Sequence, residues 1–351
     1  MPEVIFEDRA RHLVIERSGA CNAAFVELLA RTVWGSGGVQ YTMPGIAETL
    51  QNLKAPHFLS LKERGDLAAV LTVIPKKVLL GGKMYPACYS YALAVAPHLR
   101  RRGYGALLSG QALRYGLGLL GEKGIYYGYV EADNTNSLKT LEKVGRRAIG
   151  QFQILAVSRV LPKDDARLEQ PAATEKDRIV RLLTGQYADH ALLDFEQSVK
   201  WENYHLIREG KEIAAGLQCQ RGHLTIKYLP GPGGVILSKV LPYIPILGNL
   251  FPDRNYRFLT FGNIYAARGR EAEIFTLMEA LLARNRLHFG MIYLDRRSPM
   301  YQRLKAAGKF GVLHKLIDVP VQVMAFLKGF TAEETAAIRQ QPLFISMQDP
   351  V

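Results

Sequence analysis

The chain has 351 residues, of which 45 are lysine or arginine and 32 are aspartate or glutamate, and its formal net charge is +13. Apolar residues make up 48% and charged residues 22%. These are ordinary values for a globular protein, and they exclude collagen, coiled-coil and disordered chains. The length suggests two domains. The positive charge is compatible with a nucleic acid, an anionic membrane surface or a phosphorylated small ligand.

The cysteines and the apolar segments indicate in which compartment the protein functions. Three cysteines, Cys21, Cys88 and Cys219, are far apart and lack metal-ligand spacing, which favours a reducing cytoplasm. The N-terminus lacks the apolar core of a signal peptide. The longest apolar stretch, residues 235–251, is broken by lysine, proline and glycine, so we predict a buried strand and loop rather than a membrane span. The dispersed histidines predict no metal site.

The first half of the chain predicts alternating strands and helices. Apolar periodicity and turn residues predict strands at 12–16, 57–61, 67–80, 84–95, 125–131 and 148–160, and helices at 22–34, 44–53, 103–120 and 135–144. Asn22 is suited to cap the first helix. Turn signals at 63–66 and 81–83 join three of the strands into an antiparallel meander.

After a predicted linker at residues 161–165, the order of elements repeats. Helical segments are predicted from 174 to about 204. They are followed by strands at 204–208, 211–229, 256–266, 290–295 and 312–327, and by helices at 271–286, 299–307 and 331–340. Tyr129 and Tyr293 lie at nearly equal distances before Gly145 and Gly308, which end two helices. The matching order predicts an internal duplication.

The most informative stretch is Leu93-Ala-Val95-Ala-Pro97-His-Leu-Arg100-Arg101-Arg102-Gly103-Tyr104-Gly105, between a predicted strand and a predicted helix. Two glycines let the backbone turn tightly and approach a ligand. Unpaired N–H groups at a helix start favour an anion, and three arginines precede the turn. The pattern therefore predicts a pyrophosphate site. It is not a Walker loop, and Leu108 replaces the third glycine of a dinucleotide fingerprint.

With these residues the sequence resembles the GNAT superfamily of acyl-coenzyme A (acyl-CoA)-dependent N-acyltransferases. The signature of that family is a strand ending in apolar-x-Val-x-Pro, followed by [Arg/Gln]-x-x-Gly-x-[Gly/Ala], and Arg100, Gly103 and Gly105 match it. Downstream, Asn134-Thr-Asn-Ser137 through Gly145 matches the Asn-x-x-[Ser/Ala] helix that ends at glycine. The resemblance covers residues 1–160, and for residues 165–330 it rests on element order alone.

The resemblance implies an α/β (α+β) fold of tandem GNAT-like domains, each a mixed, mostly antiparallel sheet flanked by helices. We predict an acetyl-CoA-binding domain at 1–162, a second, degenerate GNAT-like domain at 163–330, and a C-terminal helix and tail at 331–351. The second domain is called degenerate because residues 266–270 keep one glycine and two arginines but no GxG. Its predicted role is to wall the substrate cleft.

The resemblance also implies which residues meet the cofactor, acetyl-CoA. The backbone near Leu93 and Val95 would pair with the pantetheine arm and polarise the thioester carbonyl. The amides from Arg101 to Ala106 would hold the pyrophosphate. The complete implied set is Leu93, Val95, Arg100, Arg101, Arg102, Gly103, Tyr104, Gly105, Ala106, Asn134 and Ser137.

The catalytic residues are less directly implied. Many members of the family use as acid a tyrosine four residues before the helix-ending glycine, but here that position is Leu141, and Arg146 replaces the usual aromatic residue after the glycine. An attacking amine must lose a proton, and the leaving thiolate benefits from an acid. We therefore predict Glu131 as base and Tyr91 or Tyr129 as acid. Direct transfer needs no nucleophile, so Cys88 is predicted to be a packed strand residue.

The resulting hypothesis is a cytoplasmic N-acetyltransferase that moves an acetyl or short acyl group to a small-molecule or peptide amine. Two alternatives remain open: a non-catalytic module that binds or senses coenzyme A, and a tandem transferase with a longer acyl or aminoacyl donor. No aromatic-interleaved basic stripe or zinc-finger spacing supports a nucleic-acid partner. No membrane span is expected, and the sequence leaves the oligomeric state open.

Overall fold

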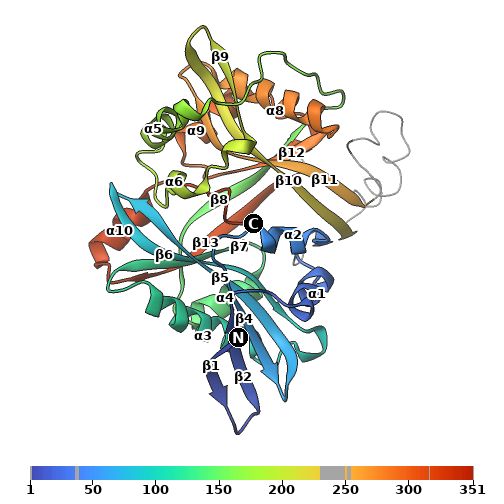
Figure 1. Cartoon of the computed structure of the whole chain (residues 1–351), viewed down its shortest axis with the longest axis vertical. Helices are drawn as coiled ribbons and strands as arrows, with labels where there is room; N and C mark the ends of the chain where they lie inside the picture. The colour runs from blue at the N-terminus through green and yellow to red at the C-terminus, as the bar shows by residue number, and fades with distance from the viewer. Residues whose placement is uncertain (1, 36–38, 230–249, 251–253, 316, 351) are drawn as a thin grey trace.

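A computed structural model describes residues 2–35, 39–229, 250, 254–315 and 317–350. Its strands form one continuous sheet through both halves of the chain, with helices on both faces (Figure 1). No helix among these residues is long and apolar enough to cross a bilayer. The apolar stretch 235–251 lies outside the described residues, apart from the buried Leu250.

The elements predicted for the first half are confirmed, with small changes at their ends. They are β2 (Leu13–Ser18), α1 (Ala23–Arg31), α2 (Ile46–Gln51), β4 (His57–Glu63), β5 (Asp66–Leu80), β6 (Lys83–Val95), α3 (Tyr104–Leu119), β7 (Gly124–Glu131), α4 (Thr135–Lys143) and β8 (Arg147–Ser158). The predicted cap on α1 is confirmed, because Asn22 Oδ1 accepts a hydrogen bond from the Phe25 amide at 2.9 Å. Two strands were not predicted, β1 (Glu3–Asp8) and β3 (Gln40–Thr42).

The second half follows the predicted order as well. Its main elements are α5 (Lys176–Gln186), α6 (Phe195–Ser198), β9 (Tyr204–Glu209), β10 (Glu212–Tyr228), β11 (Asn255–Ala266), α8 (Glu271–Asn285), β12 (Phe289–Leu294), α9 (Pro299–Ala307), β13 (Asp318–Lys328) and α10 (Ala332–Gln340). The prediction of a strand from residue 312 was wrong. Residues 312–315 form a 3₁₀ turn, whose Leu313 amide donates to Ser158 Oγ at 3.1 Å, and β13 begins at Asp318.

The two halves exchange strands. The order in the sheet is β1-β2-β4-β5-β6-β7-β13-β8-β12-β11-β10-β3, with β9 also paired to β10. Strand β13, from the end of the second half, therefore lies between β7 and β8, while β8 pairs with β12 of the second half. These two strands cross the middle of the molecule in green and red (Figure 1). The short β3 also pairs with β10, so the halves share one sheet.

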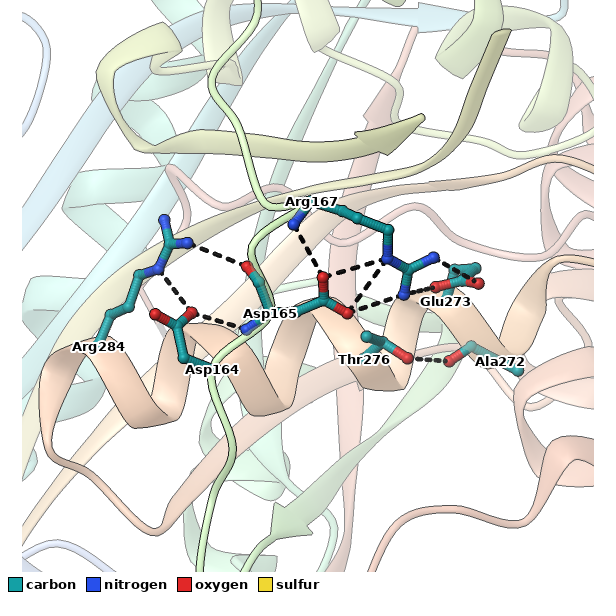
Figure 2. A network of polar contacts seen from close by, with 7 residues as sticks. All are labelled: Asp164, Asp165, Arg167, Ala272, Glu273, Thr276 and Arg284. Atoms are coloured by element: carbon teal, nitrogen blue, oxygen red, sulfur yellow. Dashed lines mark hydrogen bonds and ion pairs between the residues drawn. The ribbon is translucent and has the colours of Figure 1, made fainter. Parts of the chain in front are cut away.

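The connection between the halves lies along α8 (Figure 2). Arg284 donates from Nε to Asp164 Oδ1 at 2.8 Å and from its NH2 group to the Asp165 carbonyl at 3.0 Å. Arg167 pairs with Asp165 at 2.8 Å and with Glu273 at 3.0 Å. The hydrogen bonds from Arg167 lower the pKa of Asp165. The segment that was predicted as a linker is therefore held against the second half. The boundary at residue 162 itself stays a prediction.

Candidate functional site

An opening separates β6 from β7 in the first half. The two strands pair in parallel only from Ala87–Ile125 to Tyr89–Tyr127. Beyond that pair β6 continues along β5, and β7 continues along β13. The opening therefore begins at Ser90 on one strand and at Gly128 on the other.

A bulge shapes the β6 side of this opening. The register with β5 shifts between Val70 and Thr72, and the opposing Ala92 has φ 57°. Such a conformation is uncommon for a residue other than glycine, and bulges re-aim the groups beside them. After the bulge the Ala96 amide donates to the Ala68 carbonyl of β5 at 2.9 Å. Because successive residues of an antiparallel strand turn their N–H and C=O groups to opposite edges, Val95 faces the opening.

The loop that follows β6 presents a row of unpaired amides. Arg101 and Gly103 have φ values of 66° and 83°, and α3 begins immediately afterwards. None of the amides from Arg101 to Ala106 donates to another of the described residues. The first turn of α3 contains no acidic residue, and the side chains of residues 100–102 are exposed. The helix dipole and the charges of Arg100 and Arg101 are therefore available to an anionic ligand.

The two glycines of the loop differ in why they are needed. A side chain at Gly103 would have open space, but its left-handed φ disfavours any other residue. A Cβ at Gly105 would meet only Val95 Cγ2 at 3.5 Å, an ordinary contact. Packing within the protein therefore does not explain Gly105. A ligand that lies close to the backbone would explain it, so this loop fits a pyrophosphate.

The other predicted cofactor residues follow β6 and β7 in the chain. Tyr104 is buried and donates from its hydroxyl to Glu63 Oε1 at 2.5 Å, and Arg102 lies 3.8 Å from the same carboxylate. The hydrogen bond to Glu63 raises the pKa of Tyr104. Asn134 Oδ1 caps α4 by accepting from the Ser137 amide at 3.1 Å. That contact leaves the Asn134 Nδ2 group as the possible donor to a ligand.

The predicted catalytic residues lie on the sheet face that is covered by α1, α2 and the C-terminal segment. Alternate residues of a strand share a face, so Tyr89 joins Tyr91, and Tyr127 joins Tyr129 and Glu131. The ring centroid of Tyr89 is 6.4 Å from that of Tyr91 and 5.0 Å from that of Tyr129. Burial raises the pKa of both predicted acids, Tyr91 and Tyr129, well above that of free tyrosine.

Glu131 has a partner that sequence reasoning missed. Tyr41, on the unpredicted strand β3, donates from its hydroxyl to Glu131 Oε1 at 3.2 Å. Burial raises the pKa of Glu131, which makes this carboxylate a stronger base than an exposed one. Burial and the charge of Glu131 raise the pKa of Tyr41. Tyr41 was missed because β3 is too short to show a hydrophobic period.

A buried charged cluster joins the C-terminal segment to this face. Lys76 Nζ lies 2.5 Å from Asp194 Oδ2 and 2.8 Å from Asp349 Oδ1. The Asp349 carboxylate also accepts from the hydroxyls of Tyr127 and Tyr129, at 2.5 and 3.2 Å. Burial raises the pKa of Asp349. No local motif marks these residues, because they come from three distant parts of the chain.

A small cavity lies beside the charged cluster. It is bordered by Asn52 at the end of α2, by Lys76 and Asp349, and by Lys200 and Gln220 of the second half. Both halves and the C-terminal segment therefore contribute to its walls.

The second half has a counterpart of the opening, but its own side chains fill it. The bulge recurs at Asn263, with φ 48°, and the Ala267 amide donates to the Ala214 carbonyl at 2.9 Å. Ala266 thus corresponds to Val95. Here Gln186, at the end of α5, accepts from the Ala266 amide at 3.0 Å and donates to the Ile264 carbonyl at 2.7 Å.

The start of α8 is likewise satisfied from within. Gly269 has φ 80°, close to the value at Gly103. Unlike α3, α8 has acidic residues in its first turn, and the Glu271 carboxylate accepts from the Gly269 amide at 3.3 Å. Arg270 pairs with Glu209. The positions that would hold a phosphate therefore already contain carboxylates.

A second polar constellation, away from the opening, has the geometry of a hydrolase triad. His190 Nε2 lies 2.8 Å from Ser298 Oγ, and His190 Nδ1 lies 2.6 Å from Asp189 Oδ1. However, Ser298 is 1% exposed, and its hydroxyl accepts from the Met300 amide at the start of α9. A substrate cannot reach this hydroxyl, so the arrangement serves as a helix cap. No group of three potential metal ligands occurs among the described residues.

Comparisons with known proteins bear on the family and the fold. Residues 27–145 match the family model described as acetyltransferase (GNAT) family. The structure of Saccharomyces cerevisiae N-myristoyltransferase with bound myristoyl-CoA aligns with a TM-score of 0.58 and 10% identity, over 95% of this chain and 89% of that chain. A GCN5-related N-acetyltransferase from Sphaerobacter thermophilus aligns with a TM-score of 0.50 and 12% identity, over 88% of each chain. No curated protein sequence matches.

Residues 27–145 thus match the GNAT family, and the chain as a whole shares the fold of these solved structures. Its fold, a mixed and mostly antiparallel sheet flanked by helices, is the predicted one. The match of residues 27–145 to the acetyltransferase family model supports acyl-CoA-dependent N-acyltransferase activity. At these low identities the solved structures show the fold alone, and the residues of the opening must carry any argument about substrates.

Proposed function

We propose that this protein transfers an acetyl or other short acyl group from acyl-CoA to an amine, and that the opening between β6 and β7 is its donor site. One observation carries the proposal: the unpaired amides of Arg101–Ala106 lie at the mouth of this opening, beside exposed arginines and a bulge at Ala92. The pyrophosphate would lie on the amides. The pantetheine arm would follow Leu93 and Val95, and Asn134 and Ser137 would border it.

Glu131 and the buried tyrosines are our proposed proton-transfer groups. Glu131 would receive the proton of the attacking amine, and its raised pKa suits a base. Burial keeps Tyr91 and Tyr129 protonated. Tyr91 can then donate a hydrogen bond to a group that gains negative charge, whereas Tyr129 would first have to release its hydrogen bond to Asp349. The amine would enter by the cavity beside Lys76 and Asp349. The second half would wall this route and would bind no coenzyme A of its own.

Calorimetry tests the donor site. Acetyl-CoA should bind with one site per chain, and failure to bind at millimolar ligand would refute the proposal. Release of thiol from acetyl-CoA in the presence of a panel of small amines and peptides then tests catalysis. Glu131→Gln should leave coenzyme A binding within a few fold and slow thiol release by about a hundredfold or more, as expected for a lost general base. Binding without turnover across the panel would favour the sensing module.

A longer donor is the second candidate, because the fold aligns over 95% of this chain with an N-myristoyltransferase. Myristoyl-CoA and acetyl-CoA should be compared in the same binding assay. Tighter binding of acetyl-CoA, or equal affinity, supports the short donor. A preference of more than about tenfold for myristoyl-CoA would establish the longer one, since that ratio corresponds to about 1.4 kcal/mol of chain recognition. That the protein functions in a reducing cytoplasm stays a prediction.

A further inference from the structure

Arg146 is a buried cation at the closed end of the opening. It follows Gly145, which ends α4, and it is 3% exposed. Its Nε and one terminal nitrogen donate to the Met324 carbonyl of β13 at 3.2 and 2.7 Å, and the other terminal nitrogen donates to Ser90 Oγ at 3.0 Å. The guanidinium carbon lies 5.3 Å from the ring centroid of Tyr126.

No carboxylate of the described residues neutralises this charge. Arg146 takes part in no ion pair there, and its hydrogen-bond acceptors are a carbonyl and a hydroxyl. Burial lowers its pKa to about 10, so it stays charged at neutral pH. A buried cation without an anion is costly, and such a group is expected to have an anionic partner in another state of the protein. The other buried cation of this region, Lys76, lies between two carboxylates.

The position of Arg146 indicates where that anion would form. Ser90 and Gly128 are the first residues beyond the last parallel pair of β6 and β7. A Cβ at Gly128 would come within 2.8 Å of the Arg146 guanidinium and 2.4 Å of Ser90 Oγ, so the glycine makes room for the cation. The bulge at Ala92 is two residues farther along β6, which corresponds to about 7 Å of strand.

We propose that the guanidinium of Arg146 stabilises the coenzyme A thiolate that acyl transfer releases. This inference rests on the proposed function. In that reaction a bond forms between the amine nitrogen and the acyl carbon, and the carbon–sulfur bond breaks. The electron pair of the broken bond stays on sulfur, and the amine proton goes to Glu131. Arg146 supplies positive charge at the point where negative charge appears on the sulfur. Leu141 stands where many members of the family have a tyrosine that acts as acid, and it cannot ionise, so another residue has to stabilise the thiolate.

The titration of the bound thiol tests this role without knowledge of the acceptor. Coenzyme A is bound to the wild-type protein, and the ultraviolet absorbance of its thiolate is followed against pH, with the desulfo-CoA complex as blank. Burial raises the pKa of Cys88 to about 12 and of Cys219 to about 11, so these thiols add little signal near neutral pH. We expect the bound thiol to titrate about one to two pH units below that of free coenzyme A.

Two variants separate charge from structure. Arg146→Met should abolish the shift in thiol pKa while coenzyme A still binds within a few fold below that pKa. Arg146→Lys should keep most of the shift. If Arg146→Met does not fold, Arg146→Gln, which can still donate to the Met324 carbonyl, replaces it. An unchanged thiol pKa in the neutral variant would overturn the inference. Failure of the wild-type protein to bind coenzyme A would instead refute the proposed function.

Discussion

The opening beside β6 in the first half and its counterpart beside β11 in the second half share one backbone geometry. Both strands have a bulge at a residue with positive φ, Ala92 and Asn263, and both helices that follow begin after a left-handed glycine, Gly103 and Gly269. The two openings differ in which groups occupy their hydrogen-bond donors and acceptors. In the first half the amides are unpaired, whereas in the second half Gln186 bonds the strand edge.

The side chains of the second half imitate the groups of the proposed ligand. The amide of Gln186 makes the two hydrogen bonds that a pantetheine amide would make to a strand edge, and Glu271 supplies the negative charge that a phosphate would bring to a helix start. The second half therefore has the same backbone shape, while internal groups satisfy the donors and acceptors that a ligand would otherwise meet.

The largest expected effect comes from matched changes at the two glycines. Gly103→Glu should reduce coenzyme A affinity by at least about a hundredfold, because it strains a left-handed residue and places a carboxylate where the phosphates would lie. Gly269→Glu imposes the same strain in the second half and should leave the affinity unchanged. Calorimetry on both variants, with circular dichroism to confirm folding, measures the contrast. Equal losses would mean that the first loop is not the donor site.

Lys76→Met should cause the next largest change, a loss of about 3–5 kcal/mol in the free energy of unfolding, because it leaves Asp194 and Asp349 as buried carboxylates without their cation. Lys76 belongs to the first half and Asp194 to the second, so the change also tests how strongly the halves hold together. Urea unfolding measures it. Lys83→Met, at the exposed tip of the same hairpin, should change stability by less than about 0.5 kcal/mol.

Removal of the internal occupant of the second opening should have a moderate effect. Gln186→Ala leaves the Ile264 carbonyl and the Ala266 amide without this partner, which should cost about 1–3 kcal/mol of stability. The stoichiometry should remain one coenzyme A per chain, because Glu271 still occupies the start of α8. Gln51→Ala, exposed on α2, serves as the control. Appearance of a second binding site would show that Gln186 alone closes the second half.

The smallest expected effect is a pH dependence centred in the second half. Burial lowers the pKa of His190, so the folded protein keeps it neutral at pH values where the unfolded chain is protonated. The unfolded state then binds more protons, and stability falls as the pH drops below about 6.5. His190→Gln should reduce this loss by about 1 kcal/mol between pH 7.5 and 5.5. Equal slopes in the wild-type protein and in His190→Gln would contradict the assignment.

Local signals account for what could be predicted. The Asn22 cap, the glycine turns and the strand–arginine–glycine–helix order are set by neighbours in sequence, and the structure bears them out. Two strands were missed for a local reason, since no residue of β1 is buried and β3 has three residues. The assignment of cofactor and catalytic residues remains a prediction for the experiments above.

Long-range pairing accounts for what could not be predicted. Nothing in β8 or β13 indicates that each pairs with the opposite half, because the same alternation of apolar residues suits either neighbour. Asp349 lacks a motif, and its contacts with Lys76 and Tyr127 span more than 200 residues of chain. In the sequence, nothing distinguishes Gln186 from other polar residues at helix ends, so its hydrogen bonds to β11 could not be predicted.

By itself, the sequence determined the order of elements in both halves and the glycine turn from Arg100 to Gly105, because periodicity and turn chemistry act over a few residues. Only the tertiary structure decided that the halves exchange strands, that one opening is filled, and that Arg146 is a buried cation without a carboxylate partner among the described residues. The physical reason is that burial and hydrogen bonding depend on which distant segments come into contact. Those contacts form only when the whole chain packs together.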